Sequence, residues 1–99
     1  MDWIAVQPYY KVEREVTGIE QQSVVSERVM YLYPDKIVTQ RREFSLGDVF
    51  DMSFRRLGAE GGILYLHTKR GVYSYTVKIG PDTFMKAYRA LQSEQRNKP

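Results

Sequence analysis

Basic residues that stand in adjacent pairs are the clearest candidates for binding chemistry in this 99-residue sequence. The three pairs are Arg41-Arg42, Arg55-Arg56 and Lys69-Arg70. A further lysine, Lys36, follows the turn signal Pro34-Asp35. Neighbouring side chains on a strand point to opposite faces, so each pair offers one solvated side chain and one that leans along the sheet rim. Such charges also protect strand edges against strand addition, which is the alternative interpretation. The candidate ligand-binding residues are Lys36, Arg41, Arg42, Arg55, Lys69 and Arg70.

Residues that could support catalysis do not form a recognisable constellation. His67 is the single histidine and has no second metal ligand in its pattern, so it is predicted to be a packed or edge residue. Asp48 and Asp51 fall on opposite faces of a strand, whereas acid–base chemistry needs two carboxyl groups that converge on one site. Asp48 is predicted instead to accept backbone hydrogen bonds at a chain corner. We therefore predict no catalytic residue, no metal site, no cofactor and no enzymatic activity.

A cluster of glycines could suggest a phosphate cradle. Gly58, Gly61 and Gly62 are followed by Ile63 and Leu64, where a P-loop has a lysine and then a serine or threonine. A hairpin loop is therefore the favoured interpretation of these glycines.

Composition and charge narrow the protein class further. Fifteen Lys and Arg against twelve Asp and Glu give a net charge of +3, which is spread over the three pairs and does not demand a polyanionic partner. The lack of cysteine excludes a disulfide framework and thiolate chemistry. The first residues do not resemble a secretion signal, and no apolar stretch approaches the length of a membrane span. We expect a cytoplasmic location.

Strand signals dominate residues 9–79. Extended runs are predicted at 9–16, 24–33, 36–43, 49–54, 63–68 and 72–79, with a loop at 17–23, and residues 3–6 are a candidate seventh strand. The alternation predicts that Phe50, Met52 and Phe54 face inward. On the last run the same argument places Tyr73, Tyr75, Val77 and Ile79 inward, and Gly71 is expected to supply a positive φ at the preceding turn.

The hydrophobic period changes after Gly80. Phe84, Ala87, Tyr88 and Leu91 fall at i, i+3, i+4 and i+7, which predicts a helix over about 82–94 and a frayed tail at 95–99. Residues 1–99 are thus predicted to form a single, mainly β domain. Its expected architecture is a barrel of six or seven antiparallel strands that is capped by one C-terminal α-helix.

Four segments carry a resemblance to a known family. They are RVMYLYPDKIVT at 28–39, REFSLGDVFD at 42–51, GILYLHT at 62–68 and GVYSY at 71–75. Over about residues 9–92 the chain resembles the pleckstrin-homology-like superfold, and most of all its short bacterial and GRAM-type variants. The resemblance implies lipid, phosphopeptide, protein or scaffolding roles. The chain departs from the phosphoinositide-binding pattern, because loop 17–23 contains Glu20 and no basic residue.

The leading hypothesis is a non-enzymatic interaction module whose partner is a protein or peptide, including a second copy of the chain. The resemblance implies that a peptide pairs with an exposed strand edge beside the C-terminal helix. One alternative is binding to an anionic lipid surface through Lys36, Lys69 and Arg70 at hairpin tips. Another is single-stranded nucleic-acid binding by the eight tyrosines, but Tyr73 and Tyr75 fall on inward positions.

Overall fold

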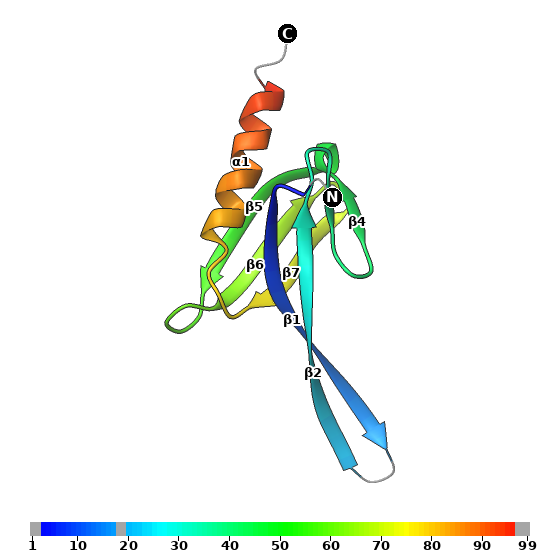
Figure 1. The fold of residues 1–99 in the computed structure, drawn as a ribbon. Helices are drawn as coiled ribbons and strands as arrows, with labels where there is room; N and C mark the ends of the chain where they lie inside the picture. Colours follow the sequence, from blue (N-terminus) through cyan, green and yellow to red (C-terminus); the bar gives the residue numbers. More distant parts are fainter. Residues whose placement is uncertain (1–2, 18–19, 97–99) are drawn as a thin grey trace.

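The computed structural model describes residues 3–17 and 20–96. Seven strands form one antiparallel sheet in the order β4-β3-β2-β1-β7-β6-β5, and a helix follows the last strand (Figure 1). The prediction of a mainly β fold with one C-terminal helix is therefore confirmed. The elements are β1 Ala5–Thr17, β2 Glu20–Leu32, β3 Lys36–Val38, β4 Glu43–Ser45, β5 Val49–Arg56, β6 Gly62–Thr68, β7 Gly71–Val77 and α1 Asp82–Arg96.

The sheet curls round a single apolar core. Its two edge strands, β4 and β5, are joined by the short 3-10 turn Leu46–Asp48, so the edges of the sheet come close to each other. Helix α1 packs on this core through Phe84, Met85 and Tyr88. The hydroxyl of Tyr88 donates a hydrogen bond of 2.8 Å to the carbonyl oxygen of Val49, which ties the helix to the start of β5. The predicted apolar stripe of the helix is confirmed.

Strands β6 and β7 follow the expected alternation most closely. Leu64 and Leu66 are fully buried, while Tyr65 between them is half-buried. Tyr73 and Tyr75 pack against the core, and Gly71 has a φ of 132°, both as predicted. The prediction for Ile79 was wrong, because β7 ends at Val77 and Ile79 is exposed beyond it.

The first hairpin is longer than predicted. The expected loop at 17–23 is wrong for residues 17 and 20–23, because β1 continues to Thr17 and β2 begins at Glu20, its cross-strand partner. Residues 18 and 19 lie outside the described chain. Residues 3–6 do not form a separate strand, because β1 begins at Ala5 and continues through Pro8. The proline is accommodated because β1 pairs with β7 only at Tyr10, so the missing N–H breaks no bond to that neighbour.

The predicted strand at 36–43 is in fact two short strands. β3 ends at Val38 and β4 starts at Glu43, and the chain reverses between them. The backbone N–H of Thr39 donates to the carbonyl of Arg42 at 2.8 Å, and the N–H of Arg42 donates to the Thr39 hydroxyl at 3.1 Å. These bonds close a turn in place of a continuing strand.

A β-bulge changes which side chains of β5 face inward. The register with β6 shifts between Val49 and Asp51, so Val49 is buried and Phe50 is 54% exposed. The prediction that Phe50 faces inward was therefore wrong, whereas Met52 is fully buried as predicted. Because the bulge adds one residue to β5, the inward positions are odd-numbered before it and even-numbered after it. A strict alternation of inward and outward side chains does not predict this change.

The helix runs from Asp82 to Arg96, so residues 95 and 96 belong to it and not to a frayed tail. The rest of the predicted tail, residues 97–99, lies outside the described chain.

Candidate ligand groove between two hairpins

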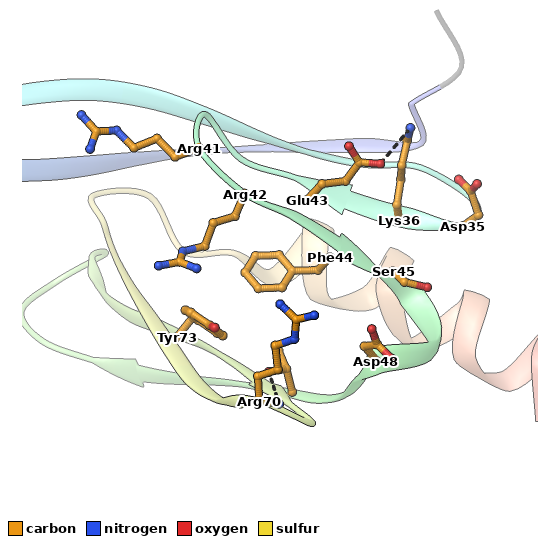
Figure 2. A pocket seen from close by; sticks show the side chains of 11 residues that line it. Asp35, Lys36, Arg41, Arg42, Glu43, Phe44, Ser45, Asp48, Arg70 and Tyr73 are labelled. Atoms are coloured by element: carbon orange, nitrogen blue, oxygen red, sulfur yellow. Dashed lines mark hydrogen bonds and ion pairs between the residues drawn. The ribbon is translucent and has the colours of Figure 1, made fainter.

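The turn between β3 and β4 presents a basic pair at one side of a groove. Arg41 and Arg42 lie in this turn, so the expectation that they point to opposite faces of a strand was wrong. The turn is anchored to β1, because the backbone N–H of Gln40 donates to the Tyr9 hydroxyl at 3.3 Å. Figure 2 shows that the Arg42 side chain extends over the groove while Arg41 extends away from it.

The turn between β6 and β7 presents a second basic pair opposite the first. The Thr68 hydroxyl donates to the carbonyl of Gly71 at 2.8 Å and accepts from the backbone N–H of Arg70 at 3.1 Å. Thr68 is itself buried, so its hydrogen bonds hold the turn against the body of the protein. The backbone position of Arg70 is thus fixed by a buried side chain.

Between these turns lies a groove of about 610 Å³, which we call the arginine groove. Figure 2 shows the guanidinium groups of Arg42 and Arg70 on two sides of the Phe44 ring, with Tyr73 below Arg42. The groove is lined by Asp35, Lys36, Arg41, Arg42, Glu43, Phe44, Ser45, Asp48, Thr68, Arg70 and Tyr73.

Aromatic rings form the floor of the arginine groove. Phe44 and Tyr73 meet edge to face with their ring centroids 5.0 Å apart. The guanidinium carbon of Arg42 lies 4.7 Å from the Tyr73 ring centroid, in cation–π range. This stacking orients the planar guanidinium without using its N–H donors, which stay available to a ligand.

Ion pairs neutralise some of the charges around the groove but leave Arg42 and Arg70 without carboxylate partners among the described residues. The ammonium of Lys36 lies 3.3 Å from the Glu43 carboxylate, and that of Lys69 lies 3.7 Å from the Asp48 carboxylate. Within residues 3–17 and 20–96, neither Arg42 nor Arg70 forms an ion pair. The positive charge available to a ligand is therefore concentrated at these two guanidinium groups.

The arginine groove continues into a second groove of about 660 Å³ that is lined by tyrosines. The two grooves share Arg41, Arg42 and Tyr73, and the second extends along β7 past Tyr75 to Thr76. Burial raises the pKa of Tyr75 above its ordinary value, although the neighbouring Thr39 hydroxyl acts against the shift. Tyr75 therefore keeps its proton at neutral pH. Because they share Arg41, Arg42 and Tyr73, the two grooves form one trough.

The candidate basic residues are only partly brought together. Lys36, Arg41, Arg42 and Arg70 line the arginine groove, and Lys69 lies beside it through its ion pair with Asp48. Arg55 is near the far end of β5, roughly 20 Å from Asp48 at the usual rise per residue. Sequence reasoning missed the aromatic floor of the groove, because Phe44 follows the predicted strand at 36–43 and Tyr73 was assigned to the core. Two of the three basic pairs thus meet at one site.

The edge of β5 beside the helix is a second place where a ligand could bind. Two carbonyl groups near the start of this edge already accept hydrogen bonds, because Gln92 donates to Phe50 at 2.8 Å and Arg89 donates to Met52 at 3.4 Å. An incoming strand would have to displace these side chains before it could pair there. The arginine groove needs no such displacement.

His67 forms a polar pair on the outer face of the sheet. Its Nε2 atom lies 2.8 Å from the Ser53 hydroxyl oxygen, and Asp51 is its cross-strand neighbour. The ring stacks on Phe50 with centroids 6.4 Å apart. The backbone N–H groups of paired β5 and β6 residues lie in the plane of the sheet, so they do not converge above this serine as an oxyanion hole. The pair links β5 to β6 across their outer face.

Asp48 lies at the chain corner, as expected. Its carboxylate faces Lys69, and its backbone carbonyl accepts a hydrogen bond of 3.1 Å from the Lys69 N–H. Gly58 and Gly61 lie in the connection between β5 and β6, as predicted, whereas Gly62 is the first residue of β6. Gly62 packs directly against the carbonyl oxygen of Arg55, which leaves no room for a side chain.

No family model and no curated protein matches the chain. Within the described residues, no helix combines the length and the apolar character that crossing a membrane requires. The same residues contain no cluster of three or more histidine and carboxylate side chains that could hold a metal ion.

Proposed function

We propose that this chain is a non-enzymatic, pleckstrin-homology-like interaction module that binds an acidic, extended segment of a protein partner in the arginine groove. The observation that carries the proposal is the placement of the Arg42 and Arg70 guanidinium groups on two sides of Phe44, without carboxylate partners among the described residues. Arginine recognises carboxylates through two parallel N–H donors, which gives both affinity and orientation.

The shape of the trough supports a peptide over a compact anion. The arginine groove opens into the tyrosine-lined groove, so a chain that places a carboxylate between Arg42 and Arg70 can continue along β7. The edges of the Phe44 and Tyr73 rings offer apolar contact to the residues that flank the acid. An extended peptide would use both features, whereas a small anion would use only the first.

The arrangement of the strands supports the family proposal. The superfold that the chain resembles has a strand hairpin, a Leu-spacer-Asp corner into the fifth strand, two more strands and a capping helix. The meander β1 to β4, the Leu46–Asp48 turn into β5, two further strands and a final helix agree with that order. The family hosts many ligands, so the ligand is argued from the groove and not from the fold.

An anionic lipid surface is a second candidate, because the basic residues at the two turns are exposed at one side of the molecule. Arg41, Lys69 and Arg70 are exposed, and they could face a charged surface together. Nucleic-acid stacking receives less support, since the face of Tyr73 is covered by Arg42 and Tyr75 packs edge to face with Tyr9.

A displayed library of random peptides selected on the protein tests the proposal. We expect the enriched peptides to contain Asp or Glu, and a synthetic copy to bind R42Q/R70Q at least 10-fold more weakly in fluorescence anisotropy. The matched control is R55Q/R56Q, which removes the same charge on exposed residues of β5 and should change affinity less than twofold. Enrichment without acidic residues, or equal losses in both variants, would refute the proposal. Co-sedimentation with phosphatidylserine vesicles but no peptide enrichment would favour the lipid candidate.

A further inference from the structure

Near the body of the protein, over residues 3–10 and 25–33, the outer face of the β1–β2 hairpin is largely apolar, where a solvated sheet face is normally polar. Residues on its inner face, such as Ala5, Leu32 and Met30, belong to the core. On the outer face Val6 pairs with Tyr31 and Pro8 pairs with Val29, so both faces of this part of the hairpin carry apolar side chains. Strands that are apolar on both parities are typical of sheets covered on both faces.

Exposed apolar side chains are concentrated on this face. Of the nine large exposed hydrophobic residues in the described chain, five lie on or beside it, each 37–56% exposed. Aromatic rings lie beside one another on the same face. The ring centroids of Trp3 and Tyr31 are 6.3 Å apart, and those of Tyr31 and Tyr33 are 6.5 Å apart. Monomeric proteins seldom leave so continuous an apolar strip in water. The five residues are Trp3, Ile4, Val6, Val25 and Val29.

The same hairpin extends well beyond the body of the protein (Figure 1). β1 pairs with β7 only at Tyr10, and β2 pairs with β3 only at Tyr31 and Leu32. From Lys11 and Ser26 outward, the described residues form a ribbon of two strands without a third, and the molecule measures 61 × 28 × 28 Å. A ribbon of two strands is marginally stable by itself in water.

We propose that two copies of the chain associate about a twofold axis through the outer faces of their β1–β2 hairpins. In such an isologous contact the same patch meets itself, so the strip of one copy covers the strip of the other and the projecting arm of each gains a neighbour. The proposal concerns a face other than the arginine groove and does not rest on the proposed function.

The charges on this face favour a second copy. Glu27 lies directly opposite Tyr10 in the hairpin, and the Lys78 ammonium lies 4.4 Å from the Tyr10 ring centroid. One acid and one base therefore flank the same ring near the middle of the strip. A twofold axis at this ring places Glu27 of one copy against Lys78 of the other, so opposite charges meet there in both directions.

Sedimentation velocity from 1 to 200 µM tests the association. We expect the wild type to sediment as a dimer at the higher concentrations, and V29K, which puts a charge on the strip, to remain a monomer with an unchanged circular dichroism spectrum. The matched control is V72K, which places the same charge on an exposed valine of β7 and should still dimerise. A wild type that is monomeric throughout would overturn the proposal, as would a dimer that V72K disrupts and V29K does not.

A charge exchange tests the orientation of the two copies. E27K should weaken dimerisation at least 10-fold, because it sets two lysines against each other, and K78E should do the same with two carboxylates. The double variant E27K/K78E restores the opposite charges and should recover dimerisation to within threefold of the wild type. If the double variant is as weak as the single ones, the proposed twofold axis is wrong.

Discussion

The β6–β7 and β1–β2 hairpins have the same topology but very different support. β6 pairs with β5 along seven residues, β7 pairs with β1, and every second side chain of β6 is buried. β1 and β2 are each 13 residues long, yet among their residues with described burial only Ala5, Tyr9, Met30 and Leu32 belong to the hydrophobic core. Because an isolated two-stranded hairpin is only marginally stable, we expect neighbouring strands and one buried face to hold the β6–β7 hairpin more firmly than the β1–β2 hairpin.

The difference also separates the two surfaces proposed above. The β6–β7 turn is fixed by the buried Thr68, so it can hold Arg70 in one position relative to Arg42. Binding sites work best on such rigid elements. The β1–β2 hairpin instead offers a long apolar strip and a projecting arm, which suit a partner that adds support. One hairpin is thus built to present side chains and the other to be covered.

Replacing Leu66 by alanine should give the largest effect, because it removes a fully buried side chain from the supported hairpin. We expect the free energy of unfolding to fall by about 2–5 kcal/mol, as is usual when a buried leucine leaves a cavity. Urea denaturation followed by tryptophan fluorescence measures the change. V72A, on the exposed side of β7, should cost less than about 0.5 kcal/mol. Similar losses in the two variants would remove the distinction between the faces of this hairpin.

Most of the fold could be predicted where the side-chain period is unbroken. The alternation at Tyr73, Tyr75 and Val77 and the helical stripe from Phe84 to Leu91 each bury one face, so pattern and structure agree. The prediction for Phe50 failed because the bulge after Val49 inserts one residue into the strand. A backbone irregularity of this kind depends on the partner strand, which the local sequence does not describe.

The candidate site was less predictable because it is made by tertiary contacts. The six basic residues were found from their type alone, but the meeting of Arg42 with Arg70 depends on the reversal at residues 39–42. Thr39 closes that reversal through its own side chain, in a segment whose β-branched residues favoured a continuous strand. Residues 20–23 were predicted as a loop because polar residues are typical of loops, but they belong to strand β2.

Replacing Gly71 by alanine should give an intermediate effect, because it strains the turn that carries Arg70. The φ of 132° at this position is rarely adopted by residues with a side chain, so we expect a loss of about 1–2 kcal/mol in unfolding free energy. G47A is the control, since its added methyl group meets only the Ser45 hydroxyl at 3.9 Å and should be nearly neutral. Urea denaturation compares the two, and an equal cost would mean that the β6–β7 turn has no special conformational requirement.

Shortening the β1–β2 hairpin should give the smallest effect on the stability of the monomer. In the shortened variant an Asn-Gly dipeptide replaces residues 12–25 and connects Lys11 to Ser26, which are already cross-strand partners. This dipeptide favours the type I′ turn of a two-residue hairpin. The removed segment lies beyond the last pairing of β1 with β7, so we expect the unfolding free energy to change by less than about 0.5 kcal/mol. The measurement is made in the V29K background, where loss of the proposed dimer cannot be mistaken for loss of folding. A decrease above about 2 kcal/mol would show that the arm stabilises the core, and the contrast between the two hairpins would then be one of length and not of support.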